Sequence, residues 1–150
     1  MTKIGDLLGD LVDDIARDAI SIGDVHMLVL DKTNGITPKD GENTRDKFFV
    51  VLGFDKEGNV IGGVVINSNI NNNLPTTITD YQLPITVEQC PFLKHKSYVN
   101  CSRLMIAERT KFSSTTFRGE MGAELMEQIV ETVKESPTMN KKMLKDFGII

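Results

Sequence analysis

The chain has 150 residues, 40% of them hydrophobic and 25% charged, with a net charge of −4. This composition fits one soluble domain over residues 1–150, and the acidic balance excludes general coating of DNA or of an anionic membrane. The N-terminus lacks a signal-peptide pattern, and no apolar run approaches the roughly 18 residues of a membrane span. We therefore expect a cytoplasmic protein whose two cysteines are reduced.

Residues 3–20 have a helical pattern, with apolar residues at steps of three and four and aspartates on the opposite face. We expect an added N-terminal helix here. Two roles stay open for it. The helix either covers an open side of the β structure or lies as a built-in inhibitor across a basic segment further along the chain.

Residues 21–112 have the pattern of β structure. Strands are expected at 26–31, at 48–55 and 59–68 as a hairpin, at 77–85 and at 97–107. Gly62 and Gly63 indicate a bulge or bend, and Pro84 confines its strand to an edge or an end, because proline donates no ladder hydrogen bond. Several short strands without intervening helices predict a small antiparallel barrel.

Residues 119–150 return to a helical pattern. An apolar stripe predicts a helix over 120–135, which Ser136-Pro137 ends. A second short helix over 140–147 precedes Gly148, which is expected in the left-handed conformation that follows many helices. The methionines of this region lie at core spacing, and we interpret them as packing residues.

The sequence has no glycine-rich phosphate loop, no HExxH motif and no CxxC motif, and neither cysteine has a histidine at metal spacing. No metal and no cofactor is therefore expected. His26 lies in a strand pattern and is expected to be packed or on the surface. His95 stands between Lys94 and Lys96, whose charges favour its neutral form, so it is either a solvated loop residue or a proton carrier.

Charge is unevenly distributed along the chain. Residues 94–118 hold six lysines and arginines against one acidic residue, Glu108, whereas residues 1–24 hold six aspartates against two cations. This asymmetry indicates an anionic partner at the basic segment or attraction between the two segments.

A cluster of asparagines follows the expected strand at 59–68. Turn chemistry accounts for residues 71–73, because asparagine is favoured in turns. Asn67 and Ser68 stand at the strand end itself. They are expected either to contact a polar ligand or to serve the loop alone.

The order of these elements resembles the MazF/PemK (Kid-like) toxin family over residues 22–134. The family patterns are an R-G-D-[IV] strand, an R-P-[VA]-[VL]-V strand, a strand ending in [IP]-T-[ST], a D-S-V-x-x-x-x-[IL] strand and G-x-[LI] before a helix. The similar runs here are Ile22-Gly23-Asp24-Val25, 47–52, 64–68, 97–104 and Gly119-Glu120-Met121.

This resemblance implies a mainly β fold with flanking helices: a curled SH3-like antiparallel barrel over residues 22–118 and C-terminal helices over 119–150. It also implies a homodimer. The activity implied is that of a toxin, a metal-independent endoribonuclease acting on single-stranded RNA, with an antitoxin-like protein as a second partner.

The resemblance also assigns candidate residues. Lys47 replaces the family's catalytic arginine, Arg45 is a substitute, and Ser68 stands at the threonine corner, so these three are the candidate catalytic residues. The candidate substrate-binding residues are Asn67, Asn69, Lys94, His95, Lys96 and Arg103. Because lysine lacks the bidentate fork of arginine, the alternative is a non-catalytic barrel of the same fold that binds a protein or a nucleic acid.

Overall fold

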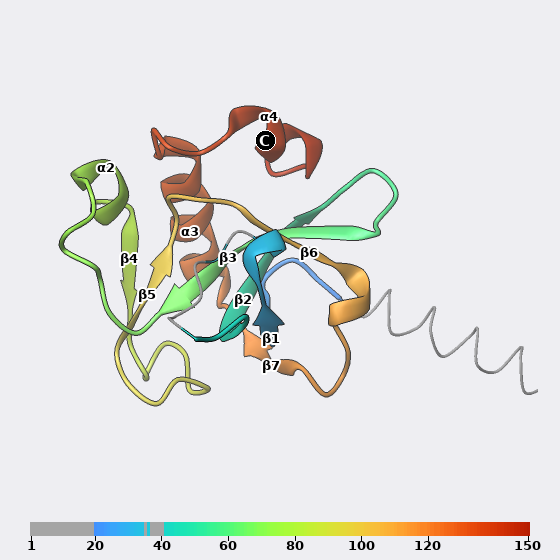
Figure 1. Ribbon diagram of the computed structural model, residues 1–150, viewed down its shortest axis with the longest axis horizontal. Helices are drawn as coiled ribbons and strands as arrows, with labels where there is room; N and C mark the ends of the chain where they lie inside the picture. Colours follow the sequence, from blue (N-terminus) through green and yellow to red (C-terminus); the bar gives the residue numbers. More distant parts are fainter. Residues whose placement is uncertain (1–19, 35, 37–40) are drawn as a thin grey trace, which may run out of the picture.

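A computed structural model of the chain describes residues 20–34, 36 and 41–150. Within these ranges the protein is mainly an antiparallel sheet of seven strands, followed by C-terminal helices (Figure 1). The order of the strands is β4-β5-β3-β2-β1-β7, and β6 also pairs with β3. The helix expected over residues 3–20 lies outside the described residues, apart from Ile20.

The bounds of the elements are as follows. The strands are β1 Asp24–Leu30, β2 Arg45–Phe54, β3 Val60–Asn67, β4 Gln82–Ile85, β5 Ser97–Asn100, β6 Met105–Glu108 and β7 Phe117–Glu120. The helices are α2 Thr76–Thr79, α3 Ala123–Glu135 and α4 Lys141–Asp146, with 3-10 turns at Lys32–Asn34 and Arg109–Lys111.

The sheet is neither closed nor strongly curled, and in this it differs from the barrel expected over residues 22–118. Strands β4 and β7 stand at opposite ends of the strand order. The bend expected at Gly62 and Gly63 is present as a register shift between β2 and β3, opposite these two glycines. One bulge bends a sheet locally, whereas closure needs tilt and stagger across all strands.

The central hairpin is confirmed. Strands β2 and β3 pair around a turn in which Gly58 has a φ of 73°, a conformation that favours glycine. Gly63 meets a different demand, because a Cβ atom there would lie 2.1 Å from the carbonyl oxygen of Val50. The two backbones approach closely only because this position carries no side chain.

Two expected strands are only partly correct. In the run 77–85 the chain first forms the helical turn α2, which Pro75 initiates, and only then the strand β4. The run 97–107 is divided into β5 and β6 by a turn, in which the backbone N–H and hydroxyl of Ser102 both donate to Asn100 Oδ1. The edge position predicted from Pro84 is confirmed, since β4 ends the strand order.

The C-terminal prediction is correct for both helices and wrong for the residues before them. Residues 117–120 form the edge strand β7, paired with β1, and α3 starts only after Gly122. Gly148 has the expected left-handed φ, at 73°. None of the helices in the described ranges is long and apolar enough to cross a membrane.

The sheet buries side chains on both faces. On one face, Val50 and Val64 pack with Ile129 of α3 and Leu144 of α4. On the other, Phe49 and alternate neighbours form a second cluster, whose members include Leu28, Leu30, Val65, Met105 and Phe112. Of the methionines expected to pack in the C-terminal region, Met121 is buried and Met126 and Met143 are partly buried against the first cluster.

Candidate functional site

A groove of about 830 Å³ lies where β2 starts and β3 ends. Arg45 and Lys47 occupy alternate positions of β2, so both side chains project from the same face of the sheet. Lys47 Nζ donates to Asn67 Oδ1 at 2.6 Å, and this contact joins the two strands across the floor of the groove.

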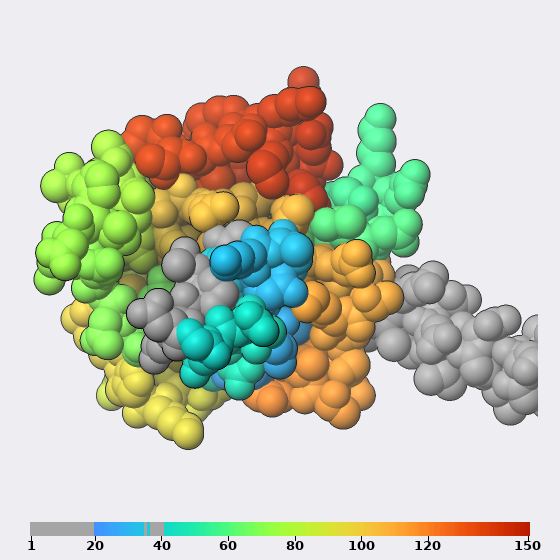
Figure 2. Space-filling model, in the orientation of Figure 1, coloured from blue at the N-terminus to red at the C-terminus, as the bar shows by residue number. Residues whose placement is uncertain are grey.

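Most of the candidate residues meet in this groove. Its described lining includes six of them: Arg45, Lys47, Asn67, Ser68, Asn69 and Arg103. The chain reaches it from three directions, because β2, the loop after β3 and the turn after β5 each contribute. Figure 2 shows the segment of residues 70–80, coloured yellow-green, projecting beside the sheet as one flank of the molecule.

The remaining three candidates lie elsewhere. Lys94, His95 and Lys96 are exposed in the loop before β5 and do not line the groove. His95 Nδ1 lies 2.9 Å from the carbonyl oxygen of Lys96, a local contact within the loop. The structure therefore gives His95 no position from which it serves the groove as a proton carrier.

Sequence reasoning missed the polar residues at the far side of the groove. Gln82 and Asn100 are paired across β4 and β5, and Gln82 Nε2 donates to Asn100 Oδ1 at 2.8 Å. Thr138, which follows α3, donates from its hydroxyl to the carbonyl oxygen of Ser102 at 2.6 Å. A signal for them was present in the sequence, because Gln82 and Asn100 each place an amide side chain within a strand. Such a side chain indicates a strand face that is open to solvent or to a ligand.

Tyr98 stands beside this lining. It pairs with Asn67 across β3 and β5, and side chains of directly paired residues project from the same face. Asn100, two residues further along β5, lines the groove on that face. Tyr98 is half-buried, and Lys96 Nζ lies 5.7 Å from the centre of its ring. The groove thus has an aromatic side chain with a neighbouring cation along one border.

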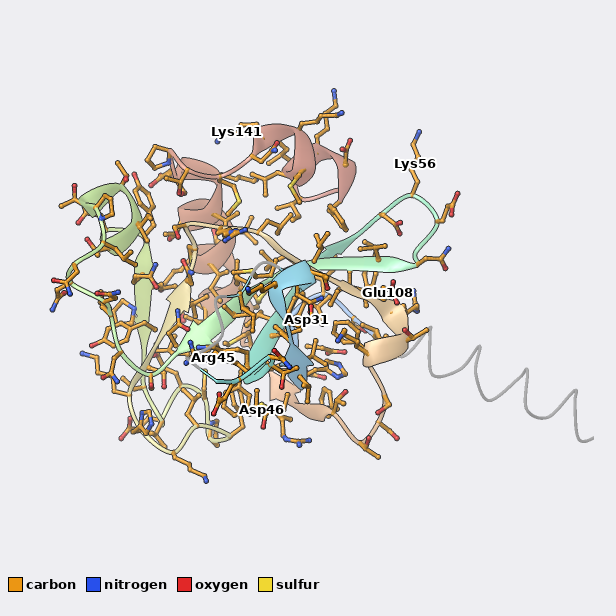
Figure 3. All side chains as sticks on the ribbon, in the orientation of Figure 1. Asp31, Arg45, Asp46, Lys56, Glu108 and Lys141 are labelled. Carbon is orange, nitrogen blue, oxygen red and sulfur yellow. The ribbon has the colours of Figure 1, made fainter. Side chains whose placement is uncertain are left out.

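The described lining of the groove has cationic and neutral polar side chains but no acidic ones. Arg45, Lys47 and Arg103 line it, and none of its described lining residues is an aspartate or a glutamate. Asp46 stands between the two β2 cations in the sequence, but strand alternation turns its exposed side chain to the other face (both Arg45 and Asp46 are labelled in Figure 3). Charge and strand geometry together collect cations and neutral amides on this surface.

The basic segment 94–118 does not form one surface. Arg103 alone among its six cations lines the groove. Arg109 donates to the carbonyl oxygen of Gly58, Lys111 to that of Val29, and Arg118 to those of Thr115 and Phe117. These cations lie on separate strands and turns, and an anionic partner for the segment as a whole stays a prediction.

Thiol and metal chemistry find no support in this region. Cys90 and Cys101 are buried free thiols, and burial raises the pKa of Cys101 to about 12. Such a thiol stays protonated at neutral pH and is a poor nucleophile. Within the described residues, no group of three histidine, cysteine, aspartate or glutamate side chains is arranged to hold a metal ion.

No family model matches the chain, and no curated protein matches it. A functional assignment therefore rests on the groove and its chemistry.

Proposed function

We propose that this groove binds single-stranded RNA. The observation that carries the proposal is its lining, in which three cations and a set of neutral amides are gathered without a described carboxylate. Cations supply most of the affinity for a phosphate backbone. Amide side chains supply paired donors and acceptors for base edges.

The border residues favour a single strand over a duplex. Unpaired bases stack on aromatic side chains, and Tyr98 stands beside the groove with Lys96 near its ring. In a duplex these bases are stacked on one another and do not reach such a ring. The groove's volume of about 830 Å³ lies within the usual range of sites for whole organic ligands, so it is larger than one phosphate ion needs.

Cleavage of the bound strand is the second part of the proposal, as in the MazF/PemK-like enzymes that the sequence resembles. One contact favours it, because Lys47 is held at Asn67, next to Ser68 and close to Arg45 along β2. The 2′-hydroxyl oxygen would bond to the adjacent phosphorus as the bond from phosphorus to the 5′-oxygen breaks. Lys47 and Arg45 would stabilise the charge on the phosphoryl oxygens, and Ser68 would donate a hydrogen bond to one of them.

Protons in this step would pass through water. The 2′-hydroxyl gives up its proton and the leaving 5′-oxygen takes one, so the balance needs no co-reactant. His95 contacts its own loop and does not line the groove, so it is not assigned the role of proton carrier. The described sheet is flatter than an SH3-like barrel, so the support for this proposal is the groove rather than the fold.

A cytoplasmic homodimer with an antitoxin-like partner remains part of the MazF/PemK proposal. Light scattering at micromolar concentration tests the dimer directly. A dimeric mass is expected, and a monomeric mass would count against this part of the proposal without touching the RNA groove.

The test of binding is fluorescence anisotropy with an unstructured RNA, in EDTA and over a series of salt concentrations. Each phosphate contact with a single strand contributes about 0.7 to the slope of log affinity against log salt. The double variant Arg45→Ala/Lys47→Ala should bind more weakly, with a slope shallower by about 1.4. Lys56→Ala is the matched control, because Lys56 is an exposed cation in the β2–β3 turn (labelled in Figure 3).

The outcomes separate the candidates. Equal affinity of the wild type and the double variant would remove the groove from RNA binding. Fragments appearing when a long unstructured RNA is incubated with the wild type in EDTA would support the endoribonuclease. Groove-dependent binding without fragments would favour the non-catalytic alternative.

A further inference from the structure

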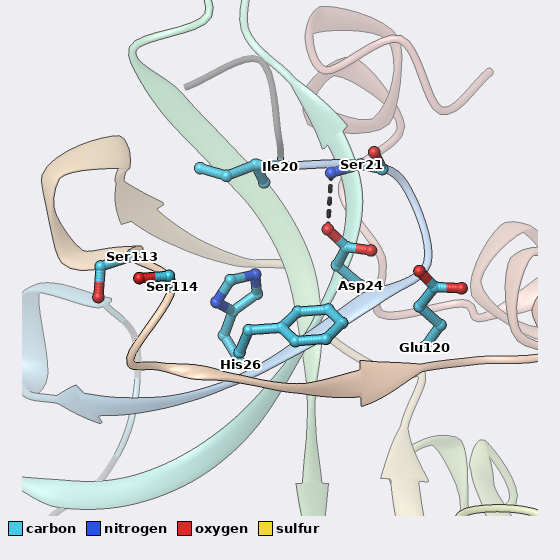
Figure 4. Close-up of a pocket in the computed structure, with 8 residues that line it drawn as sticks. Ile20, Ser21, Asp24, His26, Ser113, Ser114 and Glu120 are labelled. Atoms are coloured by element: carbon cyan, nitrogen blue, oxygen red, sulfur yellow. Dashed lines mark hydrogen bonds between the residues drawn. The ribbon is translucent and has the colours of Figure 1, made fainter. Parts of the chain in front are cut away.

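A second cavity, of about 320 Å³, lies beside the start of β1 and the edge strand β7 (Figure 4). Its lining residues are Ile20, Ser21, Asp24, His26, Ser113, Ser114, Phe117 and Glu120. It shares no described lining residue with the groove. The volume is near the lower end of the usual range for small-molecule sites, about 300–1,000 Å³.

His26 is 3% exposed and contributes an unpartnered ring nitrogen to this region. Its Nδ1 lies 2.8 Å from the hydroxyl oxygen of Thr116. The same hydroxyl also contacts the carbonyl oxygen of Ser113, which can only accept, so the arrangement that satisfies both contacts has Nδ1 as the donor to Thr116. Nε2 is buried and has no hydrogen-bond partner.

Nε2 of His26 is then an acceptor without a donor. Burial lowers the pKa of His26, while Asp24 raises it and Arg118 lowers it, and the net lowering favours the neutral ring at pH 7. A neutral ring with Nδ1 protonated presents a lone pair at Nε2. A buried acceptor without a partner costs stability, and it calls for a donor that the described chain does not supply.

Two carboxylates face each other at the same place. Asp24 and Glu120 are directly paired across β1 and β7, so their side chains project from one face of the sheet. Like charges in such a pair destabilise a sheet. Asp24 is 5% exposed, and one of its oxygens accepts from the backbone N–H of Ser21 at 2.8 Å. This contact orients the carboxylate without neutralising the pair.

We propose that this cavity binds a small organic cation, a guanidinium or ammonium group on a short apolar stem. Its N–H groups would donate to the Asp24 and Glu120 carboxylates, and to His26 Nε2 once the side chains that bury this nitrogen move aside. Its charge would offset the repulsion across the strand pair. The stem would contact Ile20 and Phe117, whose ring is 40% exposed and offers a face to a cation.

Two simpler occupants fit less well. A metal ion would need at least three close ligands, and the described residues contain no such group. The charge of Arg118 acts on His26, but the guanidinium of Arg118 is already bound to the carbonyl oxygens of Thr115 and Phe117, and Arg118 does not line the cavity. An organic cation carries several N–H donors on one frame, so it does not need the three acceptors to converge on a single point.

The test is a titration of the full chain with butylguanidinium in EDTA. The NMR signals of the ring nitrogens of its two histidines measure binding. The chemical shift of His26 Nε2 is expected to change saturably as this nitrogen gains a hydrogen bond, and the signals of His95 are expected to stay unchanged. Butylurea is the matched neutral probe, because it keeps the shape and removes the charge; it should give no saturable change. No response to butylguanidinium at millimolar concentration, or an equal response to butylurea, would overturn the proposal.

Variants locate the site. Asp24→Asn and Glu120→Gln should each weaken butylguanidinium binding by about tenfold or more, since each removes a charge-assisted hydrogen bond. Glu120 is exposed, so its variant should fold even where Asp24→Asn does not. Asp46→Asn is the control for loss of a carboxylate elsewhere. Unchanged affinity in Glu120→Gln would contradict the assignment, as would equal weakening by Asp46→Asn.

Discussion

The groove and the cavity present opposite chemistry on one face of the same sheet. Lys47 of the groove and His26 of the cavity both project from the face that buries Phe49. The groove gathers cations and amides and lacks described carboxylates. The cavity gathers two carboxylates and an unprotonated ring nitrogen. Between the two, the cluster around Phe49 and Leu28 fills the sheet face with apolar side chains.

The difference shows that strand pairing and register determine which polar side chains meet at each site. The groove forms because Lys47 and Asn67 meet across a hairpin whose strands are neighbours in the sequence. The cavity forms because β7 returns to pair with β1, which brings Glu120 opposite Asp24. The local pairing brings cations and amides together, and the distant pairing brings two carboxylates together. If the groove and the cavity act separately, a substitution in one leaves binding at the other unchanged.

The largest effect is expected on RNA cleavage. Replacing Arg45 and Lys47 together by alanine should slow cleavage by on the order of 10²-fold or more, because both supply charge to the phosphoryl oxygens. Rates on a long unstructured RNA in EDTA measure this, with Lys56→Ala as the control. Cleavage at the wild-type rate in the double variant would place the active site outside the groove.

The next largest effect concerns Tyr98. Its replacement by alanine should weaken binding of an unstructured RNA by about 1–3 kcal/mol, roughly five- to 150-fold, which is the usual loss when one stacked base loses its aromatic partner. Tyr98→Phe keeps the ring and should bind as the wild type does. If both variants lose affinity equally, the hydroxyl rather than the ring makes the contact, and the stacking assignment fails.

A substitution of His26 tests the cavity rather than the groove. Phenylalanine at this position keeps aromatic contact with Phe112 and Phe117 and removes the buried unpartnered nitrogen. We expect His26→Phe to raise the free energy of unfolding by about 1 kcal/mol at neutral pH, since the gain exceeds the lost Thr116 contact. RNA affinity should not change.

The same variant should alter the pH dependence of unfolding. Burial holds the pKa of His26 in the folded chain below the ordinary histidine value of about 6.5, so below that pH the unfolded chain binds a proton that the folded chain excludes. Wild-type stability should therefore fall as the pH drops below about 6.5, and His26→Phe should reduce this fall. Urea midpoints at pH 8 and pH 5.5 measure it. His95→Phe is the matched control, and an equal reduction in that variant would contradict the account.

The smallest effect is expected at basic residues outside the groove. Lys111→Ala should change RNA affinity by less than about twofold, because its ammonium is bound to the Val29 carbonyl oxygen away from the groove. Arg103→Ala removes a lining cation and should reduce the salt slope by about 0.7. Equal losses in the two variants would mean that RNA reads the charge of the whole segment.

The sequence was informative where polar residues stood at the ends of long, strongly patterned strands. Arg45, Lys47, Asn67 and Ser68 frame the central hairpin, whose period-two pattern and Gly58 turn fixed its register in advance. Both C-terminal helices followed from their apolar stripes. Arg103 was predicted as a binding residue only because it belongs to the basic segment 94–118.

Other features depended on pairing that no local pattern encodes. The strand β7 has the exposed and polar composition of a loop and becomes a strand only by bonding to β1. Asp24 and Glu120 lie far apart in the sequence, so their opposition was not visible in it. The degree of curling was also missed, because glycines mark where a strand bends but not how far the whole sheet closes.

The most direct test of the account is amide chemical-shift mapping with a short unstructured RNA at low salt. We expect the RNA to shift residues of the groove, Asn67, Ser68 and Arg103 among them, and to leave Asp24, His26 and Glu120 of the cavity unchanged. Shifts confined to the cavity, or spread evenly over both regions, would contradict the assignment of the groove as the RNA site.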